Sequence, residues 1–301
     1  MTEWRREIDR LKKDRNAVIL AHNYQLEEVQ AVADYVGDSF YLSKIAAKVA
    51  AEVIVFCGVR FMAETAKILS PDKTVLLPEV AAGCPLADTI TAQDIERLKQ
   101  QHADAAVVCY INSSAQVKAA SDVCCTSANA VKIAGSLPNK KLIFVPDKNL
   151  GDYIAKRLPE KEFVLGEGCC PTHAQVTPDH VEKMRARYPG AQLLVHPECC
   201  PEVTGQADFA GSTSAIIHSA ESSAAQVFLI GTEIGVLFAL KASQPHKQFI
   251  LLHEGLVCPD MKKTNIQSVY NALANNCHEI MNDKALFDKA RQSISRMLEL
   301  A

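Results

Sequence analysis

Three stretches of the 301-residue sequence decide the fold: AVILAHNY at 17–24, AAVVCYIN at 105–112 and AQLLVHPE at 191–198. Each is an apolar, strand-like run that ends in polar residues, and their starts are 88 and 86 residues apart. Similar apolar runs alternate with helical patterns along the whole chain, which is typical of parallel sheets covered by helices. We therefore predict an α/β fold.

A second series of strands keeps the same offset. FVLGEGCC begins at Phe163 and FILLHEGLVC begins 86 residues later at Phe249, whereas TVLLPEVAAGC leads from Thr74 to Cys84 in the first unit. Any α/β protein repeats strand and helix, but a constant offset at both ends of a domain-sized unit favours triplication. We expect three similar three-layer αβα domains with parallel sheets, related by pseudo-threefold symmetry. The predicted boundaries are 1–85, 86–171 and 172–261, with the C-terminal helices 262–301 packed on the first unit.

Several helix starts are marked by capping patterns. Thr91 and Thr264 begin capping-box sequences, and Thr177 precedes a proline at the first helical position. The N-terminal sequence MTEWRREIDRLKKDRN predicts a charged amphipathic helix and lacks the apolar centre of a signal peptide.

The overall composition limits the classes of partner. A formal net charge of -3 provides no broad attraction to nucleic acid or to an anionic membrane surface, and no stretch approaches the length of a membrane span. Eleven cysteines without a secretion signal indicate a reducing compartment, where the thiols are core residues or metal ligands. We expect a cytoplasmic protein that binds small molecules, with neither nucleic acid nor membrane as a partner.

Three of the cysteines are in register with the repeat. Cys84, Cys170 and Cys258 are 86 and 88 residues apart and each precedes a proline, whereas Cys200, also followed by proline, lies outside this register. Equivalent loops around a threefold axis would bring three thiolates together, a ligand set that suits zinc, copper(I) or an iron–sulfur cluster. Structural zinc usually takes four ligands, often including CxxC, which is absent here. We favour a [4Fe-4S] cluster over three separate core thiols, with one iron free of protein ligands unless a fourth ligand elsewhere in the chain closes it.

Polar groups recur where the predicted strands end. Ligands bind at the carboxyl ends of parallel strands, so we expect a shared site at the domain junction. The turns that follow are rich in hydroxyl groups, which could cap helices or bind a carboxylate or phosphate through helix N-termini. The candidate site residues are His22, Tyr24, Ser39, Tyr110, Asn112, Ser127, His196, Glu198, Ser212 and Thr213.

The motifs together resemble the quinolinate synthase family, the iron–sulfur enzymes of de novo NAD biosynthesis. The resemblance covers almost the whole chain and is highly specific. It rests on AHNYQ at 21–25, AAGCPLAD at 81–88, YINSSA at 110–115, GCCPTH at 168–173, HPEC at 196–199, GSTS at 211–214 and CPDMKK at 258–263.

The resemblance implies the three-domain fold and a transferase that condenses iminoaspartate with dihydroxyacetone phosphate, forming quinolinate, phosphate and two waters. It also implies one [4Fe-4S] cluster per chain, with Cys170 rather than Cys169 as the second ligand, and a functional link to an aspartate-oxidising enzyme. Some members carry CxxCxxC at the last ligand, whereas this chain offers only Cys258 there. An aconitase-like hydro-lyase and an iron–sulfur electron carrier remain the alternatives.

The resemblance also suggests roles for the site residues. Glu198 is expected to be the main acid/base, assisted by Tyr24 and His22. His196, Tyr110 and Asn112 would position the substrates. Bound carboxylate or phosphate groups are expected next to hydroxyl groups at helix starts, namely those of Ser39, Ser127, Ser212 and Thr213.

Overall fold

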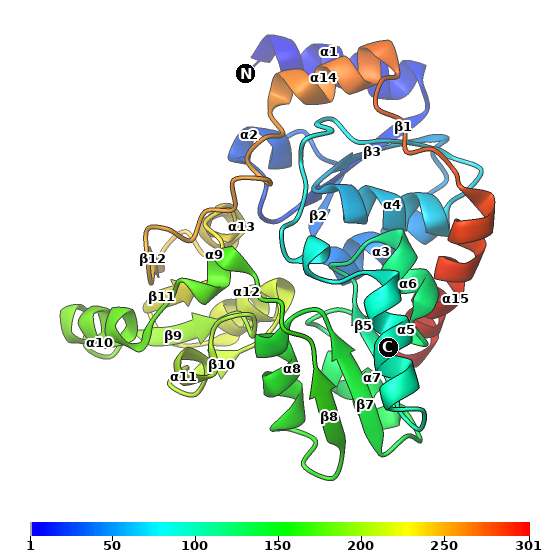
Figure 1. Ribbon diagram of the computed structural model, residues 1–301. Coiled ribbons are helices and arrows are strands. Elements are labelled where there is room, and N and C mark those ends of the chain that lie inside the picture. The colour runs from blue at the N-terminus through cyan, green and yellow to red at the C-terminus, as the bar shows by residue number, and fades with distance from the viewer. Residues whose placement is uncertain (1) are drawn as a thin grey trace.

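The computed structural model describes residues 2–301 and contains three four-stranded sheets in which all strand pairs are parallel (Figure 1). The strand orders are β2-β1-β3-β4, β6-β5-β7-β8 and β10-β9-β11-β12. The same topology therefore occurs three times, which confirms the predicted fold of three similar α/β units. The strands are β1 Ala17–His22, β2 Tyr35–Gly37, β3 Val53–Cys57, β4 Thr74–Leu76, β5 Ala106–Tyr110, β6 Val123–Cys125, β7 Lys141–Val145, β8 Glu162–Leu165, β9 Gln192–Val195, β10 Phe209–Ala210, β11 Val227–Gly231 and β12 Gln248–Leu251.

Helices cover both faces of the sheets, and most strands are followed by one. In the first unit these are α1 Thr2–Asp14, α2 Glu27–Gln30, α3 Ser39–Lys48 and α4 Arg60–Leu69. The second has the short 3-10 helix η1 Ala87–Thr89, then α5 Ala92–Gln101, α6 Ala115–Ala120, α7 Ala130–Ser136, α8 Lys148–Ala155 and α9 Pro171–Ala174. The third has α10 Pro178–Arg187, α11 Pro201–Thr204, α12 Thr213–Ser222 and α13 Val236–Ser243, and the chain ends with α14 Ile266–Asn275 and α15 Lys284–Leu300. No helix among residues 2–301 has the length and apolar character needed to cross a membrane.

Alternating side chains of the strands build the three layers. In β1, Leu20 belongs to the core shared with α3 and α4, while Ile19 belongs to the core formed with α1 and α14. In β11, Phe228 and Leu229 divide in the same way between the two faces of the third sheet. Because successive side chains of a strand point to opposite faces, continuous apolar runs are what a sheet buried on both sides requires.

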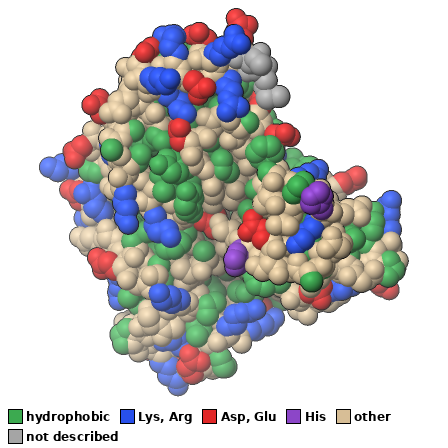
Figure 2. Space-filling model, turned by 180° about the vertical axis from the view of Figure 1, so that it is seen from behind, with side chains coloured by type: hydrophobic (Ala, Val, Ile, Leu, Met, Phe, Trp, Pro, Cys, Tyr) green, Lys and Arg blue, Asp and Glu red, His purple; other side chains and the backbone are tan. Residues whose placement is uncertain are grey.

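The buried cores divide the molecule unequally. One core extends without interruption through the first and second units, whereas the third unit has two cores of its own. In Figure 2, which shows the molecule from behind, a smaller lobe accordingly stands beside a larger body. The third unit is thus joined to the others mainly through the junction where the strands end.

The C-terminal helices lie on different units. α14 packs against α1, where Trp4 and Tyr270 meet edge to face at 5.0 Å. α15, in contrast, lies mainly against α6 and β6 of the second unit. Its apolar side, including Phe287 and Ile294, completes the core that the first two units share. The domain boundaries near residues 85 and 171 remain a prediction.

The predicted helix starts are mostly in place. Thr91 and Thr177 are N-caps with capping boxes. The prediction for Thr264 is wrong by one residue, because the N-cap of α14 is Asn265, whose side chain accepts a hydrogen bond from the Ser268 N–H. Asparagine caps at least as well as threonine, so two adjacent candidates cannot be separated by residue type.

Candidate active site

One cavity at the junction of the three units gathers the predicted site residues. It is lined by residues of all three units. The residues predicted from the sequence that line it are His22, Tyr24, Ser39, Cys84, Tyr110, Asn112, Ser127, Cys170, His196, Glu198, Thr213 and Cys258.

The threefold repeat explains this convergence. β1, β5 and β9 end at or next to His22, Tyr110 and His196, so equivalent strands point polar groups at one place. The second strands of the sheets, β2, β6 and β10, are followed by Ser39, Ser127 and Thr213. The last strands lead into the loops of the three cysteines. Each unit thus contributes side chains to the cavity from the ends of its first, second and last strands.

Ser212 is the one predicted residue that does not line the cavity. It is the N-cap of α12, and its hydroxyl accepts a hydrogen bond from the Ala215 N–H at 3.3 Å. The next residue, Thr213, faces the cavity instead. Adjacent hydroxyl residues at a helix start therefore divide the capping and cavity-facing positions between them.

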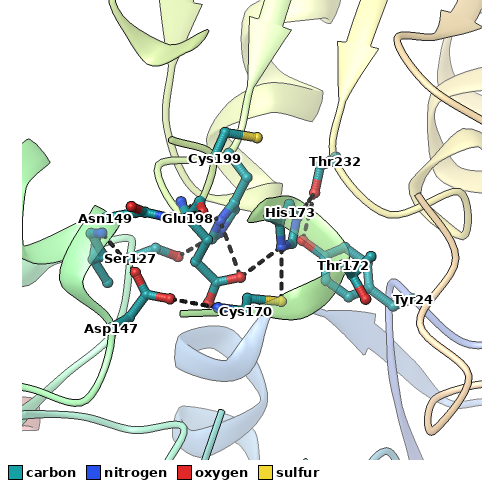
Figure 3. A network of polar contacts seen from close by, with 12 residues as sticks. Tyr24, Ser127, Asp147, Asn149, Cys170, Thr172, His173, Glu198, Cys199 and Thr232 are labelled. Atoms are coloured by element: carbon teal, nitrogen blue, oxygen red, sulfur yellow. Dashed lines mark hydrogen bonds and ion pairs between the residues drawn. The ribbon is translucent and has the colours of Figure 1, made fainter. Parts of the chain in front are cut away.

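Glu198 is the centre of the polar network in the cavity (Figure 3). Its Oε2 lies 2.7 Å from Nδ1 of His173 and 3.6 Å from Nδ1 of His196. Burial opposes its charge, but hydrogen bonds from His173 and Tyr110 favour the ionised form and help to hold the pKa of Glu198 below its usual value. Among residues 2–301, no group donates a hydrogen bond to the other oxygen, Oε1. An ionised carboxylate with one free acceptor therefore faces the cavity.

Two histidines of the cavity are held in their neutral form. Nδ1 of His22 accepts a hydrogen bond from the Tyr24 N–H at 3.1 Å, and Nδ1 of His196 accepts one from the Glu198 N–H at 3.3 Å. Burial lowers the pKa of His22 to about 4 and that of His196 to about 3. Since Nδ1 is an acceptor in both rings, each neutral ring carries its proton on Nε2, which in His196 lies 3.2 Å from Oγ of Ser127.

Tyr24 is held by hydroxyl groups of the third unit. Thr213 Oγ1 donates to its hydroxyl oxygen at 2.9 Å, and Oγ1 of Thr232 lies 2.7 Å from the same oxygen. Burial raises the pKa of Tyr24 and of Tyr110, so both are neutral phenols that can donate hydrogen bonds.

The backbones of the first and third units also approach each other closely beside Tyr24. A Cβ on Gly235 would lie 2.6 Å from the Asn23 carbonyl oxygen. Only glycine permits so close an approach of the two units at this point.

Two of the three cysteine loops are anchored by a hydrogen bond from the backbone N–H of the cysteine. The Cys170 N–H donates to Oδ2 of Asp147 at 3.1 Å, and the Cys258 N–H donates to Oε1 of Glu233 at 3.0 Å. Glu233 also forms a buried ion pair with Lys262 at 2.8 Å. Burial raises the pKa of all three thiols, that of Cys84 to about 12, and neighbouring thiols of the set add to the shift for Cys84 and Cys170.

The thiols can serve as ligands of a soft metal. Cys170 Sγ, a nitrogen of His173 and an oxygen of Glu198 lie within 4.8 Å of one another, close enough to hold one ion. However, His173 and Glu198 already satisfy each other through their 2.7 Å contact. Cys84 and Cys258 line the same cavity outside this tight group. Three thiols from three separate loops therefore line one cavity, a donor set suited to a soft metal.

Four residues that form these contacts escaped the sequence analysis: Asp147, His173, Thr232 and Glu233. His173 belongs to the GCCPTH motif but had no predicted role. Asp147 and Glu233 follow the third strand of their sheets, β7 and β11, and are 86 residues apart. The repeat that located the cysteines could therefore have located these carboxylates as well.

Comparisons with known proteins identify the family of the chain. A family model described as NadA, Quinolinate synthetase A protein, matches residues 6–299. A quinolinate synthase of Caldicellulosiruptor saccharolyticus is 55% identical over 297 residues, which cover 99% of this chain and 98% of the relative. Quinolinate synthases of Clostridium kluyveri and Geobacter metallireducens are 53% and 49% identical, and each alignment covers 98% of this chain and 97% of the relative.

Proposed function

The chain belongs to the quinolinate synthetase A family, and from this membership we propose that it condenses iminoaspartate with dihydroxyacetone phosphate, forming quinolinate, phosphate and two waters. The observation that carries the proposal is one cavity lined both by Cys84, Cys170 and Cys258 and by a buried network of acid/base groups. A hydro-lyase and an electron carrier are not favoured, because the family match spans nearly the whole chain and its curated relatives are quinolinate synthases.

The cofactor we propose is one [4Fe-4S] cluster per chain, held by Cys84, Cys170 and Cys258. The donor set supports it, since three thiols on separate loops suit a cubane that keeps one iron free of protein ligands. When bound, such a cluster supplies a Lewis acid for a substrate oxygen or nitrogen. Two buried acceptor atoms, Oδ1 of Asn112 and Oε1 of Glu198, have no hydrogen-bond partner within residues 2–301 and are left for a ligand in this cavity.

Glu198 is the proposed main acid/base. Its carboxylate is ionised, buried and adjacent to a neutral imidazole, and its free oxygen can take a proton from a substrate or return one to a leaving hydroxyl. Tyr24 and His22 are proposed to assist, because both line the same cavity and their rings meet edge to face at 4.5 Å. His196 and the phenol of Tyr110 orient the Glu198 carboxylate and the substrates beside it.

The anionic parts of the substrates are proposed to bind at the starts of helices. Ser39 and Thr213 are the first residues of α3 and α12, where free backbone N–H groups and the helix dipole favour negative charge. Ser127 precedes α7 and has its hydroxyl within reach of His196 Nε2. These positions can hold two carboxylates and a phosphate without a broadly basic surface.

The wider assignments follow from this chemistry. We place the enzyme among the transferases, in the cytoplasm, with its iminoaspartate supplied by an aspartate-oxidising enzyme. Both proposed co-substrates are small molecules, and water must be excluded from an intermediate as reactive as an imine.

The test begins with anaerobic purification of the wild-type chain. Iron, sulfide and visible absorbance are measured, followed by quinolinate formation from dihydroxyacetone phosphate and iminoaspartate generated in the assay. The same measurements are made on Cys84→Ser, Cys170→Ser and Cys258→Ser. Cys169→Ser and Cys200→Ser are matched controls, because each of these cysteines is adjacent to a proposed ligand or to a proline without being in register.

We expect the three ligand variants to lose both iron and quinolinate formation, while the two controls keep both. A wild-type chain that contains iron and sulfide but forms no quinolinate would refute the reaction. A chain that holds zinc, or that depends on Cys169 or Cys200, would refute the cluster assignment instead.

A further inference from the structure

The anchoring of the cysteine loops differs between the three units. In the second and third units, Asp147 and Glu233 lie two residues after the ends of β7 and β11, and each accepts a hydrogen bond from the backbone N–H of a cysteine. The equivalent position in the first unit, two residues after β3, is Val59, whose side chain cannot accept a hydrogen bond. The loop of Cys84 must therefore be held in another way.

Contacts that can hold this loop come from the chain segment that follows Cys258. The segment leads from β12 of the third unit to α14, which packs on α1 of the first unit (Figure 1). Where it passes the loop of Cys84, Asp260 and Lys263 contact the backbone of residues 81–83. The loops of two proposed cluster ligands from different units are thus in direct contact.

Four atoms form this contact, two donors and two acceptors. Lys263 Nζ donates to the Ala81 carbonyl oxygen at 2.8 Å and to Oδ1 of Asp260 at 2.7 Å. The Gly83 N–H donates to the same two oxygens, at 3.0 Å and 3.3 Å respectively. Each donor therefore reaches both acceptors, and the four groups form a closed hydrogen-bonded ring.

We propose that Lys263 is a positioning residue of the cluster site, which holds the loop of Cys84 at a fixed distance from the loop of Cys258. The proposal rests on the proposed cluster, because it concerns how firmly the chain retains that group. Lys263 does not line the cavity, so it acts through the two loops and not on a substrate.

The charge of the lysine explains why this residue type is required. Without the ammonium group, the Ala81 carbonyl and the Asp260 carboxylate would face each other with only the Gly83 N–H between them. Two oxygen acceptors that share one donor repel each other, so the loops would move apart. A cation between the two oxygens removes this repulsion and donates to both of them.

The ring is close to both thiols along the chain. Gly83 immediately precedes Cys84, and Asp260 is two residues after Cys258. A movement at the ring therefore shifts two of the three proposed ligands relative to each other. Groups that orient the ligands of a metal centre affect its affinity for the metal even though they do not touch it.

The test compares Lys263→Met with Lys263→Arg in the anaerobically purified, cluster-loaded enzyme. Methionine has a similar length but no donor, whereas arginine keeps the charge and can donate to both oxygens. We measure the rate of iron loss to a chelator from the decay of visible absorbance, the decay of quinolinate formation, and the unfolding midpoint. Lys161→Met is the matched control, because Lys161 Nζ also donates to two backbone oxygens, those of Leu137 and Asn139, within the second unit.

We expect Lys263→Met to lose iron about three- to tenfold faster than the wild type, at the low end for such groups because the lysine is partly exposed. Quinolinate formation should decay in step with the iron. Lys263→Arg should lose iron at close to the wild-type rate. Lys161→Met should lower the unfolding midpoint as much as Lys263→Met does, yet keep the wild-type rate of iron loss.

Asp260→Asn extends the test to the second partner. The amide oxygen can still accept from the Gly83 N–H, but it no longer carries the charge that pairs with Lys263. If the two side chains act as one contact, the double variant should lose iron little faster than Lys263→Met alone.

Four results would overturn the proposal. They are wild-type retention of iron in Lys263→Met, iron loss from Lys263→Arg as fast as from Lys263→Met, equally fast loss from Lys161→Met, and effects of the Asp260 and Lys263 substitutions that simply multiply. The third would mean that iron loss follows general stability and not this contact. A wild-type chain purified without iron and sulfide would instead refute the proposed cluster, and the role of Lys263 with it.

Discussion

Asp147 and Glu233 occupy equivalent positions in two units, and both anchor a cysteine loop. They are 86 residues apart, each follows the third strand of its sheet, and each accepts a hydrogen bond from the backbone N–H of a cysteine. The first unit lacks such a carboxylate, and its cysteine loop is tied to the third unit through the Gly83 N–H and Asp260 Oδ1 at 3.3 Å. Two of the three cysteine loops are therefore anchored by the sheet that precedes them.

Replacing Asp147 by asparagine should loosen the loop of Cys170. Oδ1 of Asp147 accepts from the Leu150 N–H at 2.8 Å while Oδ2 accepts from the Cys170 N–H, so an amide would direct an NH₂ group at one of these donors. An unsatisfied buried N–H costs about 1–3 kcal/mol. We expect Asp147→Asn to lose iron to a chelator several times faster than the wild type, measured by the decay of visible absorbance.

Asp283→Asn is the control for this experiment. Asp283 is the N-cap of α15 and accepts one backbone hydrogen bond, from Leu286, which asparagine can keep. Equal rates of iron loss in Asp147→Asn and in the wild type would show that the contact does not hold the loop.

Glu198→Gln should abolish most of the activity while leaving the site assembled. The amide oxygen can still accept from His173 Nδ1–H, but the side chain can no longer take up or release a proton. We expect kcat to fall about 10²–10⁴-fold with KM and iron content nearly unchanged. The exposed Glu202→Gln serves as control and should keep the wild-type kcat. Turnover above a tenth of the wild-type rate would remove Glu198 from the acid/base role.

The sequence located those parts of the site that repeat visibly. Apolar strands with polar ends are easy to recognise in a sequence, so His22, Tyr110 and His196 could be predicted to lie at one edge. The spacing of 86 and 88 residues predicted that the three cysteines lie together, and they line one cavity. Thr232 and Glu233 were missed because a threonine or glutamate after a strand is common as a turn or capping residue. Nothing in their residue types indicates that they touch other units.

Local patterns also could not decide between neighbours. Ser212 and Thr213 both carry a hydroxyl at the start of α12, and only the helix geometry determines which one caps the helix and which one reaches Tyr24. The position of α15 on the second unit likewise depends on which core would leave apolar side chains exposed without this helix. Packing between units is set by tertiary structure, which a single helical pattern does not encode.

The buried neutral histidines predict a loss of stability in mild acid. Burial lowers the pKa of His22 from 6.5 to about 4, so between these values the unfolded chain binds a proton that the folded chain does not. Stability therefore falls as the pH falls through this window and is fully regained above pH 6.5. For His22 alone the loss from neutral pH to about 5.5 is about 1.2 kcal/mol.

Guanidinium titrations of the anaerobic protein at several pH values between 5.5 and 7.5 measure this effect. The His22→Asn variant should show a shallower decline than the wild type, by close to one proton. His218→Asn is the control, because that side chain is 82% exposed in the folded protein and gains no burial on folding. Identical slopes for wild type and His22→Asn would mean that His22 is protonated equally in both states.

Gly235→Ala should disturb the contact between the third and first units. A Cβ at this position would lie 2.6 Å from the Asn23 carbonyl oxygen and 2.7 Å from the Tyr24 Cα, and backbone atoms cannot move aside as a flexible side chain can. Because Gln30 also donates to the Gly235 carbonyl oxygen at 3.1 Å, the two units must separate or Tyr24 must move. A shift of Tyr24 breaks its contacts with Thr213 and Thr232, so we expect kcat to fall at least tenfold together with a lower unfolding midpoint.

Gly135→Ala in α7 is the matched control. Its Cβ would meet only Leu158 Cδ2 at 3.4 Å, and alanine favours the helix by up to about 1 kcal/mol. A Gly235→Ala enzyme as active and stable as Gly135→Ala would show that the junction tolerates rearrangement and that Tyr24 is not fixed by this contact.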